Sequence, residues 1–255
     1  MKKLLATSFL FLSFYAAQAQ NTTDTTTVNM MSATPPATPA KWKNIDLSNR
    51  SNDHFMIQYG FDKWSGTNDS TTPSGFSRHF NMYFMLDKPF KNNPKFSIGL
   101  GVGIGSSNMF FEKQSIDLKS GSPRLPFSRL DSATHFKKYK LTTVFAEAPI
   151  ELRYNSNPEN SNKGFKMALG IKVGTMINAH TKGKTLVDKG GNTVNDFIMK
   201  ESSKRFFNST RLAVTGRVGV GIISVQGAYQ ITTLLKDGAG PVINPYSFGI
   251  AISGL

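Results

Sequence analysis

Several short segments of the chain alternate apolar residues with polar or very small ones, and this pattern limits the fold more than any other feature. The clearest case is FSIGLGVGIG, from Phe96 to Gly105, in which every second residue is large and apolar. An alternation with period two is that of a β-strand and excludes an α-helix. One apolar face and one nearly empty face are typical of a transmembrane barrel wall with a narrow lumen. Leu100 is then predicted to face lipid, and serine at Gly101 is expected to be tolerated much better than arginine at Leu100.

Eight segments between residues 53 and 255 carry this alternation. The predicted strands are Asp53–Trp64, Ser77–Asp87, Phe96–Asn108, Lys140–Tyr154, Gly164–Ala179, Thr210–Val220, Ile223–Leu234 and Tyr246–Leu255. After the first nineteen residues, no apolar run is long enough to cross a bilayer as a helix. The sequence therefore predicts an all-β fold, an eight-stranded antiparallel up-and-down transmembrane β-barrel over residues 53–255.

The polar face of these strands separates a membrane barrel from a soluble one. A soluble lipocalin-like binding barrel points its apolar side chains inward, whereas a membrane barrel points them outward. Here the polar face is rich in glycine, which weakens strands and brings no advantage on a surface facing water. The same face carries acids and bases on three consecutive strands, which we expect to pair inside the barrel. This predicted lumenal charge cluster consists of Glu147, Glu151, Arg153, Lys166, Lys172, Arg211 and Arg217. The soluble barrel is the less favoured alternative.

The connections between the predicted strands alternate in length. Those after the first, third and fifth strands are medium or long, and those after the second, fourth and sixth are short. All long connections are therefore expected at one rim and both termini at the other. Outer-membrane barrels have this arrangement, with long loops outside the cell and short turns in the periplasm.

The N-terminal residues predict export followed by a spacer. Lys2 and Lys3 precede a mostly apolar run that ends at Ala17-Gln18-Ala19, as in a cleaved signal peptide, here residues 1–19. Residues 20–52 are rich in threonine and proline and have no periodicity, so we expect a disordered linker on the periplasmic side of the cell outer membrane. The chain has no cysteine, which removes disulfides and thiolate metal sites.

Three strand motifs are similar to those of a known family. They are Gly99-x-Gly101-x-Gly103, APIELRY at residues 148–154, and Arg217-x-Gly219-x-Gly221 with the segment 226–234 that follows. The chain from residue 53 onward resembles the PorT-like outer-membrane β-barrel proteins of Bacteroidetes. The resemblance implies an architecture similar to OmpX and the OmpA barrel, inserted by the barrel assembly machinery. One member is associated with type IX secretion, a role that these motifs do not transfer. The chain departs from many proteobacterial barrels by ending in Ser253-Gly254-Leu255 instead of an aromatic residue.

No residue pattern predicts catalysis, a cofactor or a metal site. The four histidines, His54, His79, His135 and His180, lie in separate segments without the spacing of metal ligands. His79 lies near the outer end of its strand, where a lipid hydrolase could place a base, but spacing assigns it no serine or acid partner. An ordinary lumenal or interfacial side chain is therefore favoured. The glycine run is not followed by the Gly-Lys-Ser/Thr signature of a phosphate loop.

The two longest predicted loops, residues 106–139 and 181–209, combine basic and aromatic residues. Such loops suit outer-membrane lipid, lipopolysaccharide, surface glycan or an acidic protein partner. The simpler hypothesis is that their charges only keep flexible loops soluble. The extracellular-loop candidates for interaction are Lys137, Lys138, Lys204 and Arg205. The aromatic residues of the two loops include Phe110, Phe111, Phe127, Phe136, Phe197, Phe206 and Phe207.

Two classes of function stay open. The first is a non-enzymatic barrel with a plugged ionic lumen, active in surface interaction or in assembly or secretion. The alternative is a small pore or transporter. Eight strands leave an interior just wide enough for side chains, which disfavours a conducting pore. The formal net charge is +14, but export argues against nucleic acid as the partner.

Overall fold

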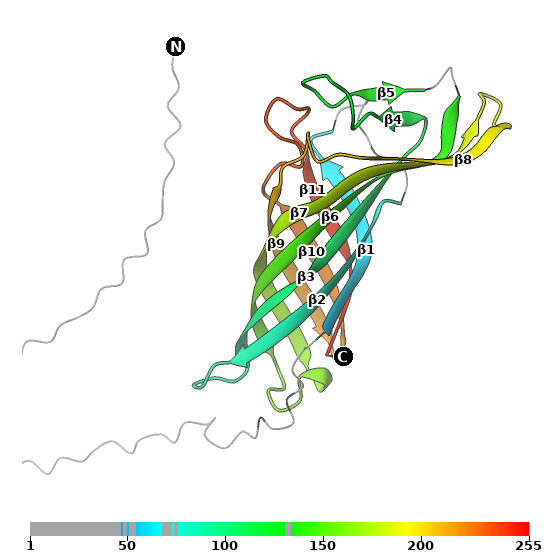
Figure 1. The fold of residues 1–255 in the computed structure, drawn as a ribbon. Coiled ribbons are helices and arrows are strands. Elements are labelled where there is room, and N and C mark those ends of the chain that lie inside the picture. Colours follow the sequence, from blue (N-terminus) through cyan, green and yellow to red (C-terminus); the bar gives the residue numbers. More distant parts are fainter. Residues whose placement is uncertain are drawn as a thin grey trace, which may run out of the picture. The chain divides into compact units, whose positions relative to one another are not determined.

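Eight long strands form a closed antiparallel barrel in the computed structural model (Figure 1). Its strands are β1 (Phe55–Ser65), β2 (Arg78–Pro89), β3 (Phe96–Phe111), β6 (His135–Asn155), β7 (Phe165–Val187), β9 (Thr210–Val220), β10 (Ile223–Gln230) and β11 (Asn244–Ser253). Each barrel strand pairs with the next barrel strand along the chain, and β1 pairs with β11 to close the ring. The predicted eight-stranded up-and-down order is confirmed.

The structure describes residues 47, 50, 55–67, 73, 76–130 and 134–254. All of them belong to the unit Ala40–Leu255. The predicted signal peptide, and the predicted linker apart from residues 47 and 50, lie outside the described residues. Among the described residues, no helix is long and apolar enough to cross a membrane.

The distribution of side chains is that of a membrane barrel. Leu100 and Leu152 face outward with 50% and 53% of their surface exposed, whereas Glu147 and Glu151 face inward with 3% and 4% exposed. The apolar alternation predicted for each strand therefore points away from the lumen. This distribution rules out the lipocalin-like alternative, in which apolar side chains would fill the interior.

Aromatic residues mark both ends of the apolar outer band. Near the periplasmic rim, the rings of Phe96 and Tyr154 lie 5.2 Å apart. Towards the other rim, the ring of Phe61 lies 5.7 Å from that of Phe248 and 5.8 Å from that of Phe76. Aromatic girdles of this kind occur where a barrel crosses the two membrane interfaces.

The inward glycines make room for large lumenal side chains. A Cβ atom at Gly99 would collide with the guanidinium of Arg153, and one at Gly105 would collide with the carboxylate of Glu147. At Gly101 a Cβ atom would collide with the sulfur of Met85, which is fully buried. A side chain at Gly101 would therefore require Met85 to shift, because the lumen there is filled, and the expected advantage of serine here over arginine at Leu100 stays a prediction.

The long connections lie at one rim, opposite both ends of the barrel sequence (Figure 1). At the periplasmic rim the tightest turn joins β9 to β10 through Gly221, whose φ of 65° is left-handed and favours glycine. The predicted seventh strand was expected to reach Leu234 but ends at Gln230, because Leu234 and Leu235 turn into an apolar core. The segregation of long and short connections is as predicted.

The two longest outer connections are shorter and more ordered than expected. Strands β6 and β7 extend well past the predicted limits, and β8 (Thr193–Ser202) pairs with the outer part of β7. At the tip of this hairpin the carboxylate of Asp188 accepts hydrogen bonds from the backbone and side chain of Asn192, which lower the pKa of Asp188. The other long connection contains the small hairpin of β4 (Gln114–Ile116) and β5 (Phe127–Arg129).

An apolar core, here called the cap, closes the outer end of the barrel. Its buried members come from the ends of the wall strands and from the outer connections. They are Trp64, Met109, Phe111, Ile116, Leu118, Leu125, Tyr139, Leu141, Phe145, Met176, Ala179, Phe206, Phe207, Leu234, Leu235, Ala239 and Ile243. Inside the cap, the hydroxyl of Tyr139 donates to the carbonyl of Ile116 (2.8 Å) and accepts from its N–H (2.9 Å).

Candidate functional site

The barrel interior is built around two buried carboxylates on β6. Glu147 lies closer to the cap. It accepts a hydrogen bond from the hydroxyl of Tyr83 (2.5 Å) and pairs with Lys172 (3.2 Å) and Arg211 (2.8 Å). The guanidinium of Arg211 also lies 4.1 Å from the ring centre of Phe145, where the ionic interior meets the cap. Four strands, β2, β6, β7 and β9, thus contribute to one charge centre.

The second carboxylate, Glu151, lies one step nearer the periplasm. Its Oε2 accepts from Arg153 Nε (2.8 Å) and from Arg217 Nη2 (2.9 Å). Arg153 also approaches Asp87 Oδ1 at 3.5 Å, and Arg217 donates to the hydroxyl of Ser253 (3.1 Å). These contacts satisfy a buried carboxylate with two cations, as a buried charge requires.

A third ionic centre closes the periplasmic mouth. Arg50 makes two hydrogen bonds to Asp87 Oδ2, at 3.0 and 2.6 Å, and donates to the carbonyls of Pro94 (2.8 Å) and Pro158 (3.4 Å). The side chain of Arg50 is 4% exposed. Arg50 falls within the predicted linker, so at least this residue belongs structurally to the barrel.

Six of the seven residues predicted for the lumenal charge cluster meet at the two glutamates. The seventh, Lys166, lies nearer the periplasmic rim, where its ammonium donates to Asn162 (3.4 Å). Sequence reasoning missed Tyr83, Asp87 and Arg50. The inward parity of Tyr83 on β2 could have found the first, but Arg50 precedes the first strand and carries no periodic signal.

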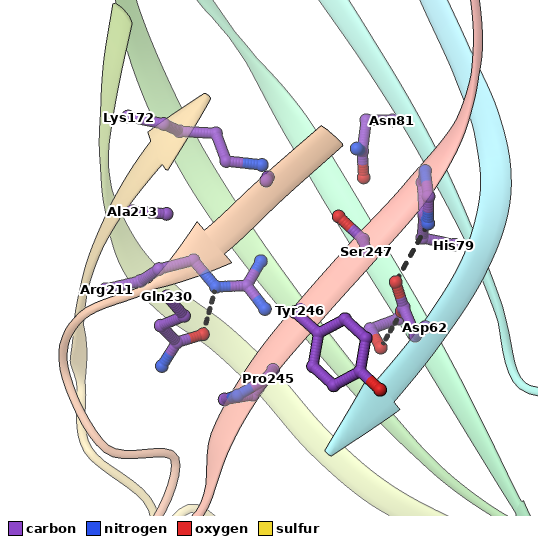
Figure 2. A pocket seen from close by; sticks show the side chains of 12 residues that line it. Asp62, His79, Asn81, Lys172, Arg211, Ala213, Gln230, Pro245, Tyr246 and Ser247 are labelled. Carbon is purple, nitrogen blue, oxygen red and sulfur yellow. Dashed lines mark hydrogen bonds and ion pairs between the residues drawn. The ribbon is translucent and has the colours of Figure 1, made fainter. Parts of the chain in front are cut away.

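A further polar group lies just inside the cap (Figure 2). His79 Nδ1 lies 2.8 Å from Asp62 Oδ1, and its Nε2 lies 2.8 Å from the amide nitrogen of Gln226. The hydroxyl of Ser107 donates to the other oxygen of Asp62. The cavity beside these residues, also lined by Lys172 and Arg211, has a volume of about 30 Å³, and a second cavity, beside Arg50 and Arg153, about 20 Å³. Each has room for only a few water molecules at most.

This histidine has an acid and a serine nearby, yet the three do not form a nucleophile and base. Ser107 is bonded to Asp62 and not to His79, and the second ring nitrogen of His79 is occupied by Gln226. A nucleophilic serine would have to donate to the histidine. Within the described residues, no three His, Cys, Asp or Glu side chains are grouped to hold a metal ion.

The four interaction candidates of the outer rim are not one cluster in a loop. Lys137 and Lys138 lie on β6, on opposite faces, and Lys204 is exposed in the turn after β8. Arg205 donates to the carbonyls of Ser120 (2.9 Å) and Gly121 (3.4 Å), so it holds the connection between β4 and β5 in place.

Three of the seven aromatic residues expected in these loops are unavailable to a ligand, whereas Phe197 is 39% exposed. Phe111, Phe206 and Phe207 are buried in the cap. Apolar side chains near the ends of the wall strands prefer each other to water, and the outer connections fold over them. The predicted rim of exposed aromatic residues is therefore incorrect for these three.

The closed barrel, its outward apolar band and its buried ionic interior define an integral outer-membrane β-barrel protein. Residues 45–232 match the family model described as an outer membrane protein beta-barrel domain, and the chain belongs to this family. The protein is accordingly located in the cell outer membrane. No curated protein matches the chain in sequence.

Two solved structures of Ail, the attachment invasion locus protein of Yersinia pestis, are similar to this chain in part. One, in complex with the heparin analogue sucrose octasulfate, has 10% identity and a TM-score of 0.33 over 78% of this chain and 96% of that chain. The other has 12% identity and a TM-score of 0.31 over 78% and 95%.

Proposed function

We propose that this protein is a closed, non-enzymatic barrel that acts through contacts made by its outer end at the cell surface. The observation that carries the proposal is the filled lumen. Three ionic centres occupy the interior, the cap covers its outer end, and the cavities between them measure only about 30 and 20 Å³. A continuous aqueous path would need far more space.

The proposed role is non-enzymatic because His79 is not arranged to act as a catalytic base. Its two ring nitrogens face Asp62 and Gln226, so a substrate hydroxyl or water finds neither nitrogen open as a base. The side chains around it satisfy one another by hydrogen bonding. Such a network stabilises the lumen and leaves the outer surface as the place where a partner is met.

At that surface, Lys137, Lys138 and Lys204 are exposed and suit an anionic partner. Arg205 is the weaker candidate, because its guanidinium is already bonded to Ser120 and Gly121. Membership in the PorT-like group rests on the strand motifs alone, and these motifs do not carry a role in secretion over to this chain.

Conductance measurements test the closed lumen. The mature chain would be refolded in detergent, its folding verified by heat-modifiable migration, and then inserted into planar bilayers. We expect no stable channels. Clear, reproducible channels of uniform conductance would overturn the proposal and favour the pore.

A binding comparison tests the outer end. One variant would carry K137Q, K138Q and K204Q, and a matched control would carry K88Q, K91Q and K163Q at the periplasmic rim, with the same loss of charge. We expect weaker binding to lipopolysaccharide at low salt for the first variant only, because exposed charges act over about 10 Å at 0.1 M salt. Equal binding by both variants would contradict the proposal.

A further inference from the structure

Five lysines share one face of the sheet that rises above the barrel wall, and we call this group the lysine ladder. Lys140 on β6 is directly opposite Lys182 on β7, which is in turn opposite Lys200 on β8. The next row on the same face pairs Lys138 with Lys184. Residues directly opposite in antiparallel strands have Cβ atoms about 4.5–5.5 Å apart.

Like charges placed directly opposite destabilise a sheet unless an anion compensates them. Within the described part of the chain, no carboxylate forms an ion pair with a lysine of the ladder. The ammonium of Lys140 donates to Asn108 (2.6 Å), a neutral amide. The two acids of β8 are otherwise placed, since Glu201 is opposite Thr181 on the other face and Asp196 accepts from Thr185 (2.6 Å). The titratable neighbour on the ladder face is His180, one row nearer the membrane.

The ladder is continuous with the lipid-facing side of the barrel. Along β7 the outward residues run from Val173 through Ile177, which is 49% exposed, and then continue as His180, Lys182 and Lys184. At the register shift between Val144 and Phe145, Ile177 is an extra residue of β7. Beyond this bulge the outward positions of β7 are therefore even-numbered instead of odd-numbered. Lys182 lies five residues beyond Ile177, or about 16 Å along a tilted strand. The first lysine row therefore lies beyond the apolar outer face of β7, where the headgroup layer is expected to begin.

The sheet that carries the ladder leans away from the barrel axis. Figure 1 shows the outer parts of β6 and β7, with β8, running sideways beyond the wall. When a wall strand leans outward, its outward face turns down towards the membrane. The lysine ladder therefore faces the headgroup layer, while the opposite face carries Tyr139, which packs in the cap.

We propose that the lysine ladder binds the phosphate groups of lipid headgroups in the outer leaflet, so that the sheet of β6, β7 and β8 lies against the membrane surface. The inference rests on the proposed closed barrel and names its partner at this face. A phosphate between two rows would meet ammonium groups from adjacent strands, and the long lysine stems can reach down to it. Flexible ammonium groups supply charge without fixed geometry, so the selectivity is for phosphate and not for one sugar.

The experiment uses the refolded mature chain in detergent and measures binding of bisphosphorylated lipid A and of the same lipid after removal of both phosphates. The test variant carries K140Q, K182Q and K200Q. The matched control carries K119Q, K189Q and K236Q, which are exposed at the outer end and off the ladder. A third variant, K140R with K182R and K200R, restores the charge.

We expect the test variant to bind bisphosphorylated lipid A roughly a hundred-fold more weakly than wild type. Each lysine near an anionic surface contributes about 1 kcal/mol to binding, and each 1.4 kcal/mol changes the affinity about tenfold. The control and the arginine variant should stay within about threefold of wild type. Removal of the phosphates should abolish the difference between variants. All variants should show wild-type heat-modifiable migration.

Equal losses in the test and control variants would reduce the ladder to general charge attraction and overturn the inference. Undiminished binding of dephosphorylated lipid would do the same, and so would displacement of lipid A by millimolar inorganic phosphate, which would assign the site to a free anion. A negative result in this lipid-binding assay would reject the lysine ladder as a phosphate site but would not affect the proposed closed lumen. Stable channels in the bilayer assay would instead reject the proposed function itself.

Discussion

The lumen and the cap are two interiors of one chain with opposite chemistry. The lumen places Glu147, Glu151 and Asp87 among arginines and lysines, and its side chains hold one another by ion pairs. The cap, directly above, is made of aromatic and aliphatic side chains such as Phe206 and Leu118. The boundary between them is the contact of Arg211 with Phe145.

The difference follows from what surrounds each region. Where the wall faces lipid, apolar side chains are satisfied outside, and the polar half of each strand must find partners inside. Where the chain rises into water, the hydrophobic effect again favours an apolar interior. The same alternating strands therefore produce an ionic core in the membrane and an apolar core above it.

The largest effect should come from breaking the lumen at Glu151. The change Glu151→Ala leaves Arg153 and Arg217 buried near one another without their shared carboxylate. Loss of one partner from a buried ion pair costs about 3–5 kcal/mol, so the denaturant midpoint should fall clearly. The exposed Glu112→Ala serves as the control and should leave the midpoint nearly unchanged. Equal midpoints would mean that water solvates the cluster.

A charge placed on the lipid side tests the direction of the pattern. Leu100→Arg should hinder insertion by about 2–4 kcal/mol, because a cation near the midplane of the bilayer is poorly solvated. The yield of folded, heat-modifiable protein from refolding into vesicles would measure this. The conservative change Leu100→Ile should refold like wild type. If arginine at this position refolds with undiminished yield, the apolar face does not meet lipid.

Truncation inside the cap should weaken the outer end without opening the barrel. Leu118→Ala removes a fully buried side chain of the cap, at a cost of about 2 kcal/mol. We expect faster proteolysis in the connection that contains β4 and β5, with the heat-modifiable barrel intact. Loss of barrel and cap together in one transition would show that the two interiors fold as a single cooperative unit.

The smallest effect is expected at the periplasmic mouth. Arg50→Gln removes the hydrogen bonds to Asp87, but Asp87 keeps its contact with Ser97 at 2.6 Å and with Arg153 at 3.5 Å. A charged hydrogen bond contributes about 1.5 kcal/mol, so the free energy of unfolding should drop by about that amount. Thermal or urea melts in detergent would detect the change. A midpoint identical to that of wild type would place Arg50 outside the folded barrel in solution.

Much of the lumen could be predicted from the sequence, whereas most of the structure at the outer end could not. Period-two alternation placed Glu147, Glu151 and Arg217 on one face of their strands, and the glycines on that face indicated that it lines the interior. The same reasoning placed Gly101 inward but could not show that Met85 fills the space opposite. The cap residues Phe206 and Phe207 follow no period, so their burial could not be distinguished from exposure on a loop.

The sequence by itself determined the strand number, the inward and outward faces and the rim that carries the long connections, because these depend on local periodicity and on chain length between strands. Only the tertiary structure decided which charges meet, since the pairing of Glu151 with Arg217 or of Arg50 with Asp87 depends on register between strands far apart in sequence. The structure also decided that Lys140, Lys182 and Lys200 form one row. A one-residue slip in register would place them on opposite faces, and no local signal in the sequence fixes that choice.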